Sequence, residues 1–355
     1  MEIQENKFVT QEEMQKFSQL MFRFVKSYKE KSTEQTDEEW LQDQILSELQ
    51  ELDTSAVIEQ SHEAIVAIHD YNNNVVSLAN AKAQGKLEEE WFASRVMQLQ
   101  AENGLENTEA AAMMTDLYNA LEQDGTLIQL QGDDWKSGKL QMLAKTLGER
   151  VMIAGYQNAA AFAGCDSSPF QFEMAEEIQQ AVIQALESGN DNGLKVAAVG
   201  ALKVASEKEI VKIVPVGIPV YVAANIACTS IENLKVTINV ADGKTTEQKA
   251  VKQMAANSMT MYLNMAFEAA GRVGGGALLG WIPFIGKPVG QAVGAAVGRA
   301  VARIAGPIIE KKLEESNHPI VKAAKNVLQN SDRTKEKIKN KVNSFAGIIK
   351  QKLFE

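Results

Sequence analysis

Two Glu-x-x-His pairs have the most familiar metal-binding spacing in this 355-residue chain. They are Glu59 with His62 and Glu315 with His318. In di-iron bundles, two helices that carry such pairs combine with glutamates from two further helices. His318 comes directly before Pro319 in the polar stretch EESNHP, where a helix is expected to end, so its ring is not expected to face a bundle interior. The sequence therefore predicts no metal site and no cofactor, and it offers no convincing catalytic set.

A Gly-Lys pair at Gly286 and Lys287 suggests a second kind of chemistry, the binding of a nucleotide phosphate. A P-loop has four residues between its first glycine and the Gly-Lys pair, which is followed by Ser or Thr. Here five residues separate Gly280 from Gly286, and Pro288 follows the lysine. Proline has neither a hydroxyl group nor an amide proton for this purpose, so we expect no phosphate loop.

The glycines of the same region instead recur at every fourth residue, through Gly286, Gly290, Gly294 and Gly298. Small residues at this spacing form a groove along one helix face and let another backbone approach closely, as in helix pairs within lipid. In water each such glycine weakens a helix by about 1 kcal/mol relative to alanine. Close packing must therefore offset this loss.

Charges around the glycines predict an antiparallel helical hairpin whose turn is WIPFIGKP. Glu268 and Arg272 precede this turn by about the same distance as Arg299 and Arg303 follow it, which places all four charges at the hairpin base. An apolar arm of about 12 residues reaches about 18 Å, less than the roughly 30 Å hydrocarbon core of a bilayer. Insertion into lipid and burial in a soluble core both remain open. The candidate packing or insertion residues are Gly275, Gly280, Trp281, Phe284, Gly286, Gly290, Gly294 and Gly298.

The stretch GGGALLGWIPFIGKPVGQAVGAAVGRAVARIAGPII resembles the glycine-zipper hairpins of bacterial membrane-active proteins. These proteins are helical pore-forming toxins or accessory proteins of bacterial dynamin-like systems. The resemblance implies an apolar hairpin stored on a soluble bundle, a switch from the soluble to the membrane form, and oligomerisation.

The elements that would carry this hairpin are mostly helices. Apolar residues near the start recur three and four residues apart, which indicates a helix with one apolar stripe. They are Met14, Phe17, Met21, Phe24 and Tyr28. Further periodic segments predict an acidic helical bundle over residues 1–190, which ends at the break LESGNDNG.

The region after this break differs in composition, because charges become rare and β-branched residues become frequent. Apolar and polar residues alternate from Leu234 to Val240, and ADGK follows as a turn, so the segment 191–250 is expected to contain a β-strand insert. The fold class is therefore mainly α, a helical bundle with a small β hairpin or tongue. Residues 251–315 form the predicted glycine-zipper hairpin, and 316–355 a basic amphipathic helix.

Charge is distributed unevenly along the chain. The part from Arg272 onward carries a net charge of +9 and the preceding part −19. The basic end can meet an anionic lipid surface or dock on the acidic body. Its candidate lipid-surface residues are Lys335, Lys337, Lys339, Lys341 and Lys352.

The first 30 residues contain no apolar segment of the secretory type, so we expect a cytoplasmic or peripheral membrane location. Cys165 and Cys228 are expected to be buried free thiols. The favoured function is membrane engagement as a pore-forming protein or membrane-associated effector, with a lipid membrane and a second copy or companion protein as partners. The alternative is a soluble scaffold or partner-binding protein in which the hairpin is core or interface. Nucleic acid is not an expected partner.

Overall fold

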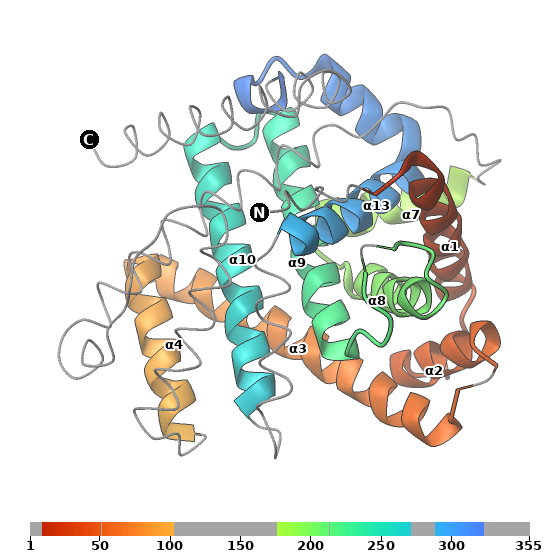
Figure 1. Ribbon diagram of the computed structural model, residues 1–355. Helices are drawn as coiled ribbons and strands as arrows, with labels where there is room; N and C mark the ends of the chain where they lie inside the picture. The colour runs from red at the N-terminus through yellow and green to blue at the C-terminus, as the bar shows by residue number, and fades with distance from the viewer. Residues whose placement is uncertain (1–8, 51, 103–175, 213, 271–287, 323–355) are drawn as a thin grey trace, which may run out of the picture.

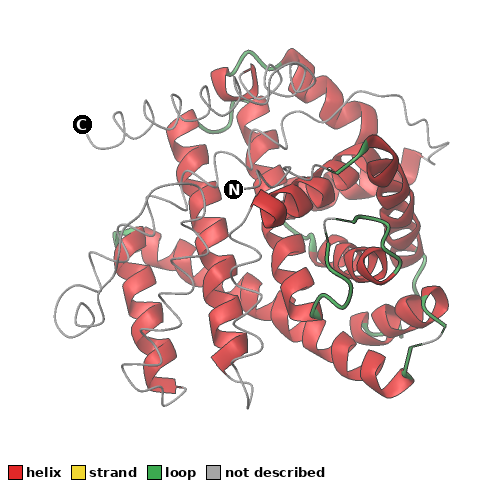
Figure 2. Cartoon of the chain, in the orientation of Figure 1, coloured by secondary structure: helices red, strands yellow, loops and turns green. Residues whose placement is uncertain are grey.

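The computed structural model describes residues 9–50, 52–102, 176–212, 214–270 and 288–322. Within these ranges the chain is helical apart from the connecting loops, and they contain no strand (Figure 2). The mainly α class predicted from the sequence is therefore confirmed. The helices are α1 (Gln11–Lys29), α2 (Asp37–Glu48), α3 (Thr54–Ala83), α4 (Glu88–Glu102), α7 (Glu176–Ser188), α8 (Asn192–Glu207), α9 (Val220–Ala241), α10 (Glu247–Ala270) and α13 (Pro288–Glu315).

Local sequence signals set the starts of the first helices. Thr10 and Glu13 form a capping box at α1, and Thr36 and Glu39 form another at α2, so each pair satisfies backbone N–H groups that a helix start leaves unbonded. Asp53 caps α3 by accepting a hydrogen bond from the Ser55 backbone N–H. These caps define where α1, α2 and α3 begin.

The apolar stripe of α1 faces the core as predicted. Met14, Phe17, Met21 and Phe24 are buried, and Tyr28 is half-buried at the end of the helix. The stripe packs on α8 and α13.

Helix α8 lies at the centre of one half of the molecule, where Figure 1 shows it nearly end-on inside a ring of other helices. It packs against α1, α2, α3 and α9, and every residue from Leu194 to Ser206 is buried. A helix that is buried on all sides needs small side chains wherever a neighbour comes close, and Ala, Val and Gly predominate here. The segment after the predicted boundary at residue 190 therefore shares one core with the helices before it.

The β-strand predicted from Leu234 to Val240 is wrong, because these residues belong to α9. The strand prediction requires the polar residues that alternate with the apolar ones to face water. Two of them instead have buried partners: Thr237 donates to the Asn233 backbone oxygen at 2.9 Å, and Lys235 forms ion pairs inside the protein. The turn at ADGK is confirmed, since Gly243 adopts φ 71° between α9 and α10.

Candidate functional site

Part of the predicted glycine hairpin lies within the described residues, namely the end of α10 and most of α13. Gly290, Gly294, Gly298, Arg299 and Arg303 all belong to α13, and Glu268 belongs to α10. Several predicted site residues lie outside the described ranges, and for them the proposed roles stay predictions. These are Gly275, Gly280, Trp281, Phe284, Gly286, Arg272, Lys335, Lys337, Lys339, Lys341 and Lys352.

The glycine face of α13 packs on α9. Gly294 and Gly298 are buried, and a Cβ atom added to Gly294 would lie 3.1 Å from the Ser230 Oγ of α9. Ser230 in turn donates to the Ile226 backbone oxygen at 2.6 Å, which fixes the position of its hydroxyl. The close approach predicted for the glycine series is thus present at this position, and the surface it meets belongs to the same chain.

The two helices that flank residues 271–287 do not form a broad mutual contact in the described part of the chain. Helix α10 packs on α9, α3 and α4, whereas α13 packs on α9, α1 and α7. Arg299 and Arg303 are half-buried on α13, and Glu268 is half-buried near the end of α10. The predicted charges at the hairpin base also include Arg272, which lies outside the described residues. The arrangement of all four charges therefore remains a prediction.

A backbone break divides α13. Gly306 has φ 49° and ψ −128°, a conformation that favours glycine, and Pro307 follows it. The part after the break is anchored, because Lys312 Nζ lies 2.6 Å from Glu187 Oε1 and 3.0 Å from Asp242 Oδ2. The part before it, residues 288–305, carries the glycines; we call it the glycine arm.

A row of buried amide and hydroxyl side chains runs between α9, α10 and α3, and we call it the polar seam. Its members are Asn225, Thr229, Asn233 and Thr237 of α9, Asn257 and Asn264 of α10, and Asn74 of α3. Asn257 Nδ2 donates to Asn233 Oδ1 at 3.0 Å, and Asn74 Nδ2 donates to Asn264 Oδ1. Hydrogen bonds between such side chains are typical of helix pairs that associate in lipid.

Four buried or nearly buried charges form a closed cluster beside the polar seam. Lys195 Nζ lies 2.7 Å from Glu232 Oε1 and 3.2 Å from Asp191 Oδ1, and Lys235 Nζ lies 2.9 and 3.0 Å from the same two carboxylates. Lys195 Nζ also donates to Asn72 Oδ1 at 2.7 Å. Each charge therefore has opposite charges as neighbours, which compensates for the loss of water on burial.

The cluster sets the protonation of its members. Burial alone would raise the pKa of Glu232, but Lys195 and Lys235 lower it below its ordinary value. Burial raises the pKa of the Cys228 thiol to about 12, so the thiol is protonated and unreactive at neutral pH. Cys228 is thus the buried free thiol expected from the sequence, whereas Cys165 lies outside the described residues.

Sequence reasoning missed this cluster. The available signal was a pair of lysines, Lys195 and Lys203, set into the otherwise apolar run LKVAAVGALKVA. A lysine in such a run must find a carboxylate, and Lys203 does so in Glu207 at 2.6 Å. Asp191, four residues before Lys195, could be identified in the same way, but Glu232 could not, because only the packing of α9 on α8 brings it to Lys195.

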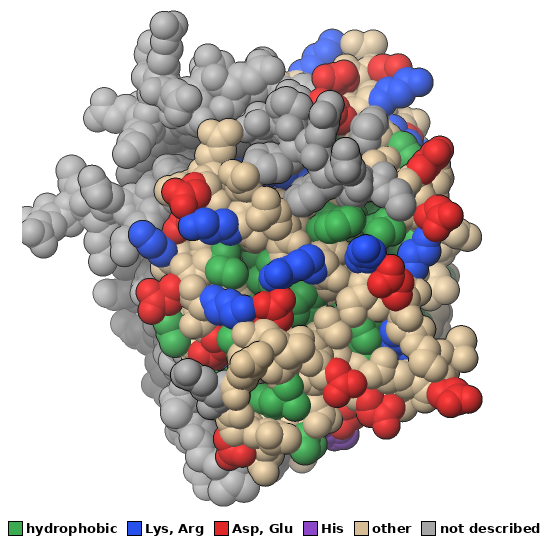
Figure 3. Space-filling view, turned by 90° about the vertical axis from the view of Figure 1, so that its right-hand side faces the viewer, with side chains coloured by type: hydrophobic (Ala, Val, Ile, Leu, Met, Phe, Trp, Pro, Cys, Tyr) green, Lys and Arg blue, Asp and Glu red, His purple; other side chains and the backbone are tan. Residues whose placement is uncertain are grey.

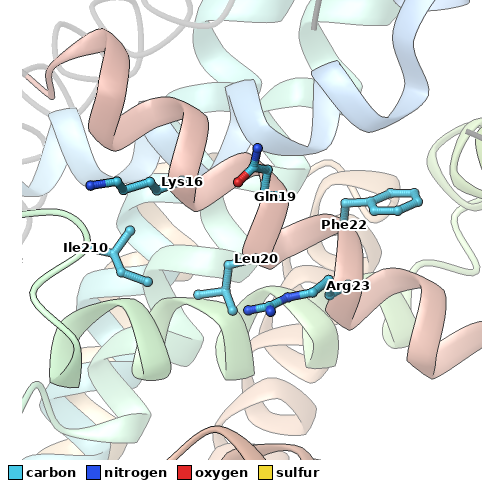
Figure 4. A pocket seen from close by; sticks show the side chains of 6 residues that line it. All are labelled: Lys16, Gln19, Leu20, Phe22, Arg23 and Ile210. Carbon is cyan, nitrogen blue, oxygen red and sulfur yellow. The ribbon is translucent and has the colours of Figure 1, made fainter. Parts of the chain in front are cut away.

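A surface pocket of about 440 Å³ lies between α1 and the loop that follows α8. Figure 4 shows its lining residues, which are Lys16, Gln19, Leu20, Phe22, Arg23 and Ile210. Both cations already have carboxylate partners, since Lys16 lies 2.7 Å from Glu12 and Arg23 lies 2.9 Å from Glu48. On the face that carries α1, charges of both signs are interspersed with hydrophobic side chains (Figure 3). The pocket lining contains no nucleophile paired with a base.

The histidines of the Glu-x-x-His pairs have local partners. His62 is exposed, with Nδ1 3.1 Å from Glu38 Oε2. His318 lies in the break after α13, as predicted, and its Nδ1 accepts from the Ile320 backbone N–H at 3.4 Å. Among the described residues, no three His, Cys, Asp or Glu side chains form a group suited to a metal ion.

Comparison with family models, with curated proteins and with solved structures finds no match to this chain. Of the helices that the structure describes, none has both the length and the apolar character needed to cross a bilayer.

Proposed function

We propose that this protein engages lipid membranes through its glycine arm, as a pore-forming protein or membrane-associated effector, and that the fold described here is its closed, water-soluble form. The observation that carries the proposal is the contact between Gly294 and Ser230. Here the arm meets α9 through a glycine and a small hydroxyl side chain, the kind of contact that helices make within lipid. The same surface can therefore pair with a helix of another copy once the arm leaves α9.

The break at Gly306 supports this proposal, because it gives the arm a place to pivot. The helical segment beyond the break is held by Lys312 through two ion pairs, so it can stay in place while the arm moves. The arm of residues 288–305 is about 27 Å long at 1.5 Å per residue, close to the roughly 30 Å hydrocarbon thickness. Arg299 and Arg303 would then face the inside of an assembly, where charged side chains in membranes are usually found.

The first test combines flotation with vesicles of phosphatidylcholine and phosphatidylglycerol, release of a trapped dye, and a measurement of oligomeric mass. We expect the protein to float with the vesicles, to release the dye and to gain mass on them. Protein that neither floats nor releases dye between pH 4 and 8 would exclude the proposal.

A covalent lock tests the part played by the glycine arm. Ser230→Cys and Gly294→Cys place two thiols where a Cβ and an Oγ are 3.1 Å apart, in a background with Cys165→Ser and Cys228→Ala. Side chains this close suit a disulfide. The oxidised protein should lose dye release, and a reducing agent should restore it. Each single cysteine variant, treated with the same oxidant, is the control.

The second candidate function is a soluble scaffold or partner-binding protein. It is favoured by the burial of Gly294 and Gly298 within the continuous core of the described helices. In that case the oxidised and reduced forms of the double-cysteine protein should behave alike, because the arm never leaves α9. Equal dye release by the two forms would likewise show that any membrane activity resides elsewhere in the chain.

A further inference from the structure

The polar seam has an unusual arrangement along α9, because its four members on that helix recur at every fourth residue. Asn225, Thr229, Asn233 and Thr237 therefore follow one side of the helix, and each side chain is at most 4% exposed. Soluble helices usually turn such a row toward water. Here the row is buried, α10 and α3 both pack on α9, and Asn233 meets Asn257 of α10.

Part of the hydrogen-bonding capacity of the seam is not used by protein groups. Within the described part of the chain, Asn225 Oδ1, Asn233 Nδ2 and Asn264 Nδ2 are buried without a protein partner. A buried polar atom without a partner costs about 1–3 kcal/mol. An apolar side chain of similar shape would avoid this cost, so packing in the closed form alone does not account for amides at these positions.

The opposite side of α9 is apolar except for Lys235, which follows Ile231 by one turn. Ala223, Ala227, Ile231 and Leu234 recur three or four residues apart and are buried. The helix has 22 residues, which corresponds to about 33 Å at 1.5 Å per residue, against a hydrocarbon thickness of roughly 30 Å. Helix α9 is therefore an amphipathic helix of bilayer length whose polar side is hidden.

We infer that the polar seam takes up water and lines an aqueous path when the protein acts on a bilayer, with the apolar side of α9 turned toward lipid or a neighbouring helix. The inference rests on the proposed membrane function and adds the element that contacts the permeating solute. Neutral amide and hydroxyl groups form hydrogen bonds with water and with small hydrated solutes, and they do not select solutes by charge. Because the seam residues carry no charge, the path should conduct small ions of both signs.

Cysteine accessibility tests this inference. In the background with Cys165→Ser and Cys228→Ala, we introduce Thr229→Cys or Thr237→Cys in the seam, and Ala227→Cys on the apolar side as the matched control. All three positions are at most 4% exposed in the closed form, so each should react slowly with a membrane-impermeant, positively charged thiosulfonate. After addition of phosphatidylglycerol vesicles, the seam cysteines should react at least about tenfold faster than Ala227→Cys, because only they reach water. Their modification should also reduce dye release.

The outcomes separate the inference from the proposed function. If protein without these changes neither floats with vesicles nor releases dye, the proposed function fails and the inference fails with it. If it floats and releases dye while the seam cysteines react no faster than Ala227→Cys, only the inference is overturned. Two seam positions are used so that a folding defect in one variant, detected by circular dichroism, leaves the other to decide.

Discussion

Glycines allow close helix packing in both α8 and α13, but their neighbours differ. A Cβ atom added to Gly200 of α8 would lie 2.5 Å from Phe24 Cε1 and 2.8 Å from Leu41 Cδ1, whereas one added to Gly294 of α13 would lie 3.1 Å from a single serine hydroxyl. Phe24 and Leu41 are at most 1% exposed and have no space to move. At Gly200, α8 is thus fixed by the shape of its neighbours. The glycine arm is buried as well, but at Gly294 its contact with α9 is less tight. Helix α8, which we expect to stay in place, and the glycine arm, which we expect to move, therefore differ in how closely their glycines are surrounded.

The charges of α8 give the largest expected effect. Lys195→Met removes the ammonium group that contacts both Asp191 and Glu232, and leaving carboxylates buried without a full set of partners typically costs 3–5 kcal/mol. Because Lys235 still contacts both carboxylates, we expect a loss of about 3 kcal/mol in the free energy of unfolding, measured by urea denaturation. Lys208→Met, which removes an exposed partner of Glu48, is the control and should cost less than about 1 kcal/mol. A loss this small for Lys195→Met would show that α8 is not fixed by its charges.

Gly200→Ala tests the steric part of the comparison. The added methyl group would overlap Phe24 and Leu41, and overpacking a core typically costs 1–3 kcal/mol. Alanine returns up to about 1 kcal/mol through its better helix propensity, so we expect a net loss of about 2 kcal/mol. Stability unchanged or increased in urea would mean that α1 and α2 move apart readily.

Gly193→Ala should have an intermediate effect. Its Cβ atom would overlap the Tyr28 ring, but this ring is only half-buried and can swing outward. The movement would break the hydrogen bond from the Tyr28 hydroxyl to Asp37 Oδ1, now 2.7 Å long, at a cost of about 1 kcal/mol. The emission of Trp40, whose ring centroid lies 5.0 Å from that of Tyr28, should change at the same time. An unchanged emission spectrum would contradict the expected ring movement.

The stabilisation of the fold by ionised Glu232 should be lost at low pH. The pKa of Glu232 is lowered in the folded protein, so its ionised form stabilises the fold above the ordinary glutamate pKa, and this contribution is lost as the pH falls through the lowered value. Lys195, Lys235, Asp191, Tyr71 and Cys228 are the other titratable groups around it. Between pH 4 and pH 2, the unfolding free energy should fall less steeply for Glu232→Gln than for the unmodified protein. Parallel curves would show that Glu232 does not contribute to acid sensitivity.

The smallest effect is expected for Gly294→Ala. The new methyl group needs Ser230 to yield by only a few tenths of an ångström, and the gain in helix propensity of about 1 kcal/mol offsets that cost. We expect a change within about 0.5 kcal/mol in the same denaturation assay. A loss as large as that of Gly200→Ala would abolish the contrast between the two helices and favour a permanent core role for the glycine arm.

Local patterns in the sequence determined several features of this protein by themselves. The period of Met14, Phe17, Met21 and Phe24 defined the buried side of α1. Gly243 within ADGK marked a turn, and the stretch around His318 marked the end of a helix. These features depend on neighbouring residues and on the intrinsic preferences of the backbone, which the order of residues specifies directly.

Only the tertiary structure decided what surrounds α8 and α9. Alternation from Leu234 to Val240 indicated a strand, yet Lys235 lies in a helix and contacts Asp191, which packing brings close to it. In the same way, the spacing of the glycines predicted a close contact but did not show that Gly294 would find it on Ser230. Sequence periodicity reflects the contrast between a solvent-exposed and a buried face, and a helix buried on all sides lacks this contrast. Its partners far apart in sequence are therefore known only from the fold.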